Sequence, residues 1–200
     1  RFAAFFNIFE QEDGVLAIAG TGTVFIGKKN GKFISIGGWG HLLGDEGSSY
    51  DIARKALKIL IKEFELGHLR SSFSKAIAQK YNLENSSLLK EFVYSSDKSQ
   101  IAQISYFVYQ LAKKNDEHAL SLIRNAGYEL ASQTARLIEM LQLPDPFKIG
   151  CKGSLLEKNE ILLKFYKQQL LRQYKGLSFI IGGPETIKGT VAAWKNAPKG

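Results

Sequence analysis

Two glycine-rich segments contain the residues of this sequence whose types and spacing suit the binding of a small polar ligand. The first is Gly20-Thr21-Gly22-Thr23, which lies between two apolar runs. Glycine lets the backbone turn tightly, so that successive N–H groups can converge on an anion, and the threonine hydroxyls add further donors. This pattern predicts a phosphate-binding turn. A plain hairpin turn is the alternative, because the Gly-Lys-Ser/Thr of a Walker loop does not follow.

The second segment, residues 37–48, reads Gly-Gly-Trp-Gly-His-Leu-Leu-Gly-Asp-Glu-Gly-Ser. Each ordered glycine costs about 0.5–1 kcal/mol relative to alanine, a cost that is easier to understand if the backbone must approach a ligand. A carboxylate such as Asp45 can accept hydrogen bonds from vicinal hydroxyls, and an aromatic plate such as Trp39 can cover the apolar face of a sugar. We therefore predict sugar binding by Trp39 and Asp45. Capping of the next helix is the alternative role for Asp45.

The composition is typical of a folded protein, with 44% hydrophobic and 23% charged residues in a chain of 200. The formal charge of +8 is spread along expected helices rather than grouped, so we expect no nucleic-acid partner. No apolar run is long enough to span a bilayer and no leader opens the chain, which favours a cytoplasmic location without a membrane partner. One cysteine and three histidines predict neither a disulfide nor a metal site.

Strand and helix periodicities place the two segments in an α/β framework. Apolar or alternating runs predict strands over 15–19, 24–28 and 33–36, and Asn30-Gly31 predicts the turn of the second hairpin. An apolar stripe with the helical period predicts a helix over 48–65, and a polar loop is expected over 95–99. The remaining predictions are strands over 147–151 and 177–181, and helices over 2–9, 73–81, 86–92, 117–141, 155–174 and 189–195, with one more helix marked by Ile101, Ile104, Val108 and Leu111.

The predicted order is three strands, a helical block, and then strand, helix, strand and helix. This order is typical of an α/β lobe that carries a helical insertion.

The Gly-Thr-Gly-Thr turn, followed after one hairpin by Gly-Gly-Trp-Gly-His-Leu-Leu-Gly-Asp-Glu-Gly-Ser, resembles the N-acetylglucosamine kinase family. That family lies within a broader group that also holds the activator ATPases of acyl-CoA reductases and dehydratases. The resemblance implies the actin/hexokinase/Hsp70-type ATPase fold, in which two RNase H-like lobes close over ATP and substrate. We therefore expect residues 1–200 to form the C-terminal lobe, an RNase H-like α/β lobe with a largely helical insertion at 66–146.

The resemblance also implies roles for individual residues, together with ATP and Mg²⁺ as cofactors. These are ATP phosphate binding by Gly20, Thr21, Gly22 and Thr23, adenosine binding by Gly153 and Ser154, and sugar binding by Gly38, Trp39 and Asp45. The catalytic base and the magnesium-positioning acid belong to the N-terminal lobe in this family, so both are expected upstream of Arg1, in a lobe absent from the chain. Residues 1–200 alone are then expected to be inactive.

The function implied is ATP-dependent phosphorylation of an amino sugar such as N-acetylglucosamine, with a small-molecule sugar as the partner. One alternative is an activator-type ATPase, although a lone Cys151 is poor support for the iron–sulfur cluster of that class. The other is a sugar or nucleotide sensor without turnover. A homodimer stays open as a further prediction.

Overall fold

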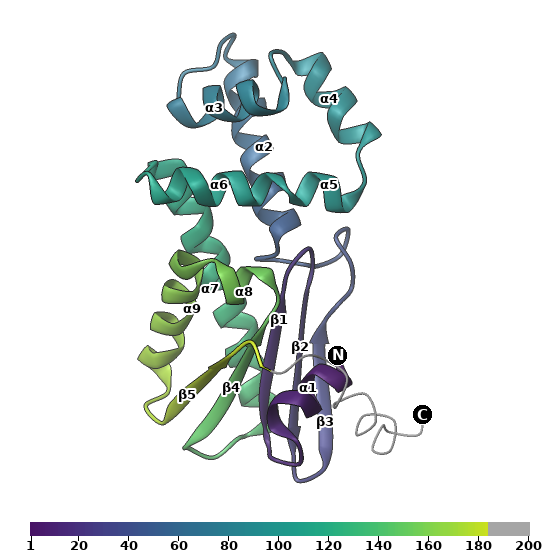
Figure 1. Ribbon diagram of the computed structural model, residues 1–200, viewed down its shortest axis with the longest axis vertical. Helices are drawn as coiled ribbons and strands as arrows, with labels where there is room; N and C mark the ends of the chain where they lie inside the picture. The colour runs from purple at the N-terminus through teal and green to yellow at the C-terminus, as the bar shows by residue number, and fades with distance from the viewer. Residues whose placement is uncertain (184–200) are drawn as a thin grey trace.

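A five-stranded mixed sheet forms one end of the molecule, and the computed structural model describes it with its helices over residues 1–183 (Figure 1). The strands follow the order β3-β2-β1-β4-β5 across the sheet. β2 pairs antiparallel with β1 and β3, whereas β4 pairs parallel with β1 and β5. The strand bounds are Gly14–Ala19 for β1, Thr23–Lys29 for β2, Lys32–Gly37 for β3, Phe147–Lys152 for β4 and Leu177–Ile181 for β5.

The helices cover both faces of the sheet and build a separate block beyond one of its edges (Figure 1). α2 begins beside the sheet and extends into this block, which α3, α4, α5 and α6 complete. The predicted insertion at 66–146 spans α3 to α7. The helix bounds are Phe2–Phe9 for α1, Ser49–Glu65 for α2, Ser72–Tyr81 for α3, Ser86–Ser95 for α4, Lys98–Ala102 for α5, Ile104–Lys113 for α6, Glu117–Leu141 for α7, Ser154–Lys158 for α8 and Glu160–Gln173 for α9.

The antiparallel half of the sheet is a meander whose second turn follows from its sequence. Lys29 pairs with Lys32, and the two residues between them, Asn30 and Gly31, have φ angles of 49° and 78°. Positive φ at both central positions defines the tight hairpin turn that Asn-Gly favours. The predicted hairpin is therefore confirmed.

The parallel half of the sheet needs helical crossovers, because a tight turn cannot join two parallel strands. α7 precedes β4 and packs on β1, β2 and β3, while α8 and α9 join β4 to β5. The carboxyl ends of β1, β4 and β5 consequently lie at the same edge of the sheet.

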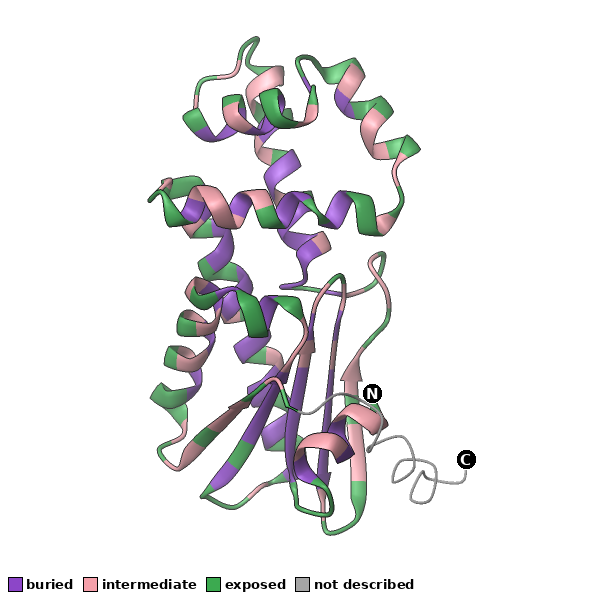
Figure 2. Ribbon diagram, in the orientation of Figure 1, coloured by how far each residue is buried: buried purple, intermediate pink, exposed green. Residues whose placement is uncertain are grey.

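β1 is covered on both faces, which explains why its sequence is continuously apolar. Val15 and Ala17 belong to a large core that includes side chains of α7. Leu16 joins a smaller core on the opposite face with Phe5 and Phe9 of α1. Figure 2 shows the buried residues running through the central strands. The packed sheet thus fixes the positions of the turns that follow its strands.

Two predicted helix boundaries are wrong for the same physical reason. The predicted loop over 95–99 is partly helical, because Asp97 caps α5 and forms a capping box with Gln100. The predicted continuous helix over 155–174 is interrupted at Asn159, whose side chain accepts a hydrogen bond from the Leu162 amide. Short polar side chains that bond to nearby backbone can start or stop a helix within an apolar periodicity. The helix predicted over 189–195 lies outside the described residues.

None of the helices in residues 1–183 combines the length and the apolar character that crossing a lipid bilayer requires.

Substitution of Gly153 tests the close contact between the ends of β4 and β1. Its φ is 93°, and a Cβ at this position would overlap the carbonyl group of Ala19. We expect Gly153→Ala to lower the free energy of unfolding by about 3 kcal/mol or more, since a left-handed φ and a backbone clash act together. Urea denaturation of the full-length protein measures this loss.

Gly31→Ala is the matched control, because Gly31 has a similar φ of 78° but nothing within 4 Å of an added Cβ. Here only backbone strain operates, and the expected loss is about 1–2 kcal/mol. Equal losses in the two variants would contradict the close approach of Gly153 to Ala19.

Candidate functional site

Glycine follows each of the three parallel strands at the edge where their carboxyl ends meet. Gly20 follows β1, Gly153 follows β4 and Gly182 follows β5. The Gly182 amide donates to the Cys151 carbonyl at 2.9 Å, so the chain folds closely over the end of β4. Ligands of α/β proteins bind characteristically outside the carboxyl ends of parallel strands. This edge is therefore the candidate site.

The structure brings the predicted phosphate turn and the predicted adenosine residues together. A Cβ added to Gly20 would lie 3.7 Å from Oγ of Ser154, which is exposed. The contact follows from the parallel pairing of β1 with β4, which places Ala19 beside Gly153. Residues that are far apart in the sequence thus line one continuous surface.

The turn between β1 and β2 has two amides available for a ligand. The Gly20 amide donates to the Gly22 carbonyl at 3.0 Å, and the Thr23 amide donates to Oδ1 of Asp45 at 2.8 Å. The amides of Thr21 and Gly22 make no hydrogen bond to another described residue. Since Thr21 is also exposed, this part of the turn can offer two N–H groups and one hydroxyl to an anion.

Asp45 lies directly beneath the turn, where it is 3% exposed. Its Oδ1 accepts the Thr23 amide, and its Oδ2 lies 2.6 Å from Nζ of Lys98. A Cβ at Gly22 would lie only 2.7 Å from Oδ1 of Asp45. A side chain at position 22 would therefore push the carboxylate away from the Thr23 amide, whatever ligand the turn holds.

Protein groups bond several of the amides at the start of α2. Ser48, and not Asp45, caps the helix by accepting the Asp51 amide, and the Gly47 amide donates to Asp51 at 3.0 Å. Burial raises the pKa of Asp51, but hydrogen bonds from Lys55, Arg54 and the Gly47 amide outweigh burial and hold the pKa below its ordinary value. The Gly47 and Asp51 amides are therefore already bonded within the protein and not free for a phosphate.

α2 also contacts the turn directly. The Ser49 amide donates to the Gly20 carbonyl at 2.8 Å, so the helix holds the turn from one side.

The loop between β3 and α2 presents apolar side chains to solvent. Trp39 is 74% exposed, Leu42 85% and Leu43 79%. The Gly38 amide donates to the Thr23 carbonyl at 2.9 Å, which anchors the loop to the second strand of the phosphate turn. The exposed Trp39 ring follows directly after the residue that anchors the loop to the turn. An exposed ring of this kind can cover the apolar face of a sugar.

Three residues at this edge were not predicted as site residues: Lys98, Glu157 and Gly182. Oε1 of Glu157 accepts the Gly153 amide at 2.7 Å, and a Cβ on Gly182 would lie 3.5 Å from Oε2 of Glu157. The Gly182-Gly183 pair directly follows a predicted strand, and this pattern could have predicted that Gly182 belongs to the site. Lys98 carries no local signal, since it comes from a helix far along the chain.

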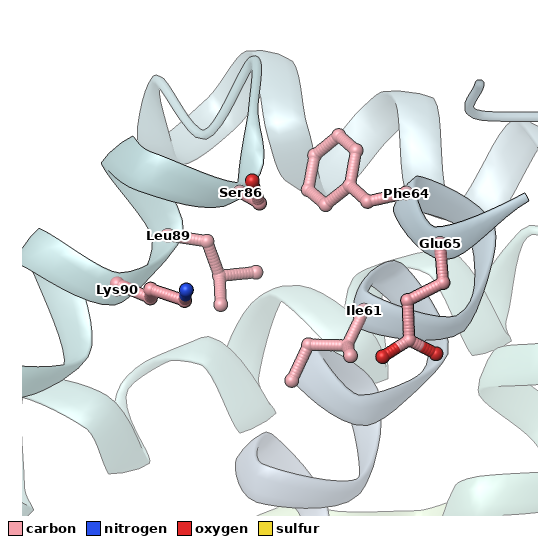
Figure 3. A pocket seen from close by; sticks show the side chains of 6 residues that line it. All are labelled: Ile61, Phe64, Glu65, Ser86, Leu89 and Lys90. Carbon is pink, nitrogen blue, oxygen red and sulfur yellow. The ribbon is translucent and has the colours of Figure 1, made fainter. Parts of the chain in front are cut away.

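A separate cavity lies between α2 and α4 of the helical block and has a volume of about 330 Å³ (Figure 3). It is lined by Ile61, Phe64, Glu65, Ser86, Leu89 and Lys90. None of these residues belongs to the glycine-rich segments or to the strand ends. The cavity is therefore separate from the candidate site.

Within residues 1–183, no three histidine, cysteine or acidic side chains gather as metal ligands would.

Two curated proteins are similar to this chain in sequence. The chain is 31% identical over 137 residues to an N-acetylmuramic acid/N-acetylglucosamine kinase of Clostridium acetobutylicum, covering 67% of this chain and 45% of that protein. It is 26% identical over 167 residues to an N-acetyl-D-glucosamine kinase of Dictyostelium discoideum, covering 80% of this chain and 52% of that protein. The chain spans about half the length of these relatives.

The fold is shared with a candidate N-acetylglucosamine kinase from Chromobacterium violaceum, whose crystal structure superposes with a TM-score of 0.74 at 17% identity. The match covers 95% of this chain and 62% of that one. This superposition confirms the predicted fold class, and the sequence relatives confirm the family resemblance. The model of the BadF/BadG/BcrA/BcrD ATPase family matches residues 2–181, and the chain belongs to this family.

Proposed function

We propose that the protein containing this chain transfers a phosphoryl group from ATP to an amino sugar such as N-acetylglucosamine, in the cytoplasm. The observation that carries the proposal is the meeting of a turn with free amides, a strand-end serine and an exposed tryptophan at one edge of the sheet. The relatives named as N-acetylglucosamine kinases support the same substrate class.

The turn and the end of β4 form the proposed nucleotide site. The free amides of Thr21 and Gly22 would bind ATP phosphates, with Gly20 and Thr23 completing the turn. The adenosine would lie against Gly153 and Ser154, since Ser154 is the exposed neighbour of Gly20.

The loop after β3 forms the proposed sugar site. Trp39 would cover the apolar face of the ring, and the backbone at Gly38 would lie close to the sugar. The carboxylate of Asp45 has about four lone-pair positions, of which two are used by Thr23 and Lys98. The remaining positions would accept sugar hydroxyls when the loop moves to admit them.

In this mechanism the residues of the chain bind and orient the two substrates, which is a large part of catalysis in phosphoryl transfer. Mg²⁺ would neutralise charge on the ATP phosphates, and the group that positions it would come from outside residues 1–183. The same holds for the base that takes the proton of the attacking hydroxyl.

The activator-type alternative is less well supported. Cys151 is fully buried in β4, and burial raises the pKa of its thiol to about 12. A cluster ligand must be a deprotonated thiolate that the cluster can reach. A coupled assay of the full-length protein with Mg-ATP and a panel of amino sugars tests the proposal, and hydrolysis without sugar phosphorylation would overturn it.

Gly20→Ala tests the nucleotide site, because the added methyl group meets only Oγ of Ser154, at an ordinary contact distance of 3.7 Å. We expect the dissociation constant for ATP to rise about tenfold, since the methyl group occupies space at the phosphates. Sugar affinity and melting temperature should change little. Calorimetric titration measures both affinities. Gly31→Ala, in the turn at the opposite end of β2, is the control and should leave the affinity for ATP unchanged.

Trp39→Ala tests the sugar site. Trp39 is largely exposed, so its loss should leave stability unchanged while N-acetylglucosamine binds about tenfold more weakly, because stacking contributes on the order of 1 kcal/mol beyond the buried area. Leu42→Ala, on the same loop and also largely exposed, is the matched control. If both variants bind the sugar as the unchanged protein does, Trp39 is not part of the sugar site.

A further inference from the structure

We propose that Lys98 is a positioning residue that neutralises Asp45 beneath the phosphate turn, so that the turn can accept a nucleoside di- or triphosphate. The inference rests on the proposed nucleotide site and adds a residue from the helical block to it. Asp45 and Lys98 lie 53 positions apart in the sequence.

The carboxylate of Asp45 is placed where a bound phosphate would feel its charge. Its Oδ1 holds the Thr23 amide at 2.8 Å and lies 2.7 Å from the position of a Cβ on Gly22. Gly22 supplies one of the two free amides of the turn. Because the carboxylate is almost fully buried, water screens it poorly, and an unpaired negative charge there would repel an anion on the turn.

Lys98 removes this repulsion. Its Nζ lies 2.6 Å from Oδ2 of Asp45, and this is the one ion pair recorded for Asp45 within residues 1–183. The side chain of Lys98 is 30% exposed, against 4% for that of Asp45. The ammonium group can thus stay hydrated on one side while it compensates the buried carboxylate on the other.

The start of α5 is built to keep Lys98 at this place. Asp97 and Gln100 form a capping box that defines the first turn of α5. One turn further along, Ile101 and Ala102 are buried where α5 packs on α2. The helix is therefore held at both ends, and Lys98 at its first position is directed towards Asp45 by a fixed backbone.

Removing the charge of one partner is expected to affect ADP binding differently from removing the charge of the other. Lys98→Met leaves an unpaired carboxylate beneath the turn, so ADP should bind about tenfold more weakly or worse. Asp45→Asn retains an acceptor for the Thr23 amide and leaves the Lys98 ammonium group unopposed, so ADP should bind at least as tightly as before. The double variant should bind ADP at least about threefold more tightly than Lys98→Met, because the repelling charge is gone.

Calorimetric titration of the full-length protein with ADP in the absence of sugar measures all three variants. Lys98→Arg should restore normal ADP affinity, since it keeps the charge. Lys148→Met is the matched control: it breaks a 2.7 Å ion pair with Glu12 on the surface and should leave ADP binding unchanged.

Three results would overturn the proposal: normal ADP affinity in Lys98→Met, weaker ADP binding in Asp45→Asn, or a double variant as weak as Lys98→Met. If Lys98→Met does not fold, Lys98→Gln, which also removes the charge but keeps a polar side chain, is titrated with ADP in its place, with the same expected loss of affinity. Failure of the unchanged protein to bind ADP would instead refute the nucleotide site itself, and the two failures are therefore distinct.

Discussion

The candidate site depends on the pairing of the buried Asp45 carboxylate with the Thr23 amide and the Lys98 ammonium group. The carboxylate joins the Thr23 amide at the start of β2 to the Lys98 ammonium group at the start of α5, and it sits itself in the loop that leads to α2. A buried carboxylate without partners would cost several kcal/mol. Because both partners are present, one side chain connects the sheet edge, the glycine-rich loop and the helical block.

The glycines of the site serve the packing of the protein as much as they admit a ligand. Gly22 leaves space for the carboxylate of Asp45, and Gly153 leaves space for the backbone at Ala19. Gly47 has a φ of 76°, and a Cβ there would lie 2.9 Å from the Ala126 carbonyl on α7. Ligand approach alone is therefore not a sufficient explanation for a glycine-rich segment, since close contacts between backbones place the same demand.

The amides near the edge of the sheet differ in whether they are already hydrogen-bonded within the protein. At the start of α2 the Gly47 amide bonds to Asp51, the Asp51 amide to Ser48 and the Ser49 amide to the Gly20 carbonyl, so these three amides hold the protein together and are not free for an anion. The amides of Thr21 and Gly22 remain, as does the exposed ring of Trp39. In the proposed function these groups form one wall of a cleft, and the reactive groups come from beyond residues 1–183.

Local sequence patterns determined much of the fold, because strand and helix periods depend on near neighbours. The predicted bounds of α1, α7 and β5 match the structure, and those of the other strands differ by a residue or so. The boundaries at Lys98 and Asn159 escaped prediction, since side-chain bonds to the backbone competed with the apolar period there.

The sequence alone also singled out the phosphate turn, the Trp39 loop and Gly153-Ser154, since glycine spacing and residue chemistry are visible without coordinates. Only the tertiary structure decided that Ser154 lies beside Gly20 and that Lys98 pairs with Asp45. The first contact depends on the parallel pairing of β1 with β4, and the second on the packing of α5 against α2. Both are long-range contacts that no local period encodes, because the hydrophobic core selects which distant elements meet.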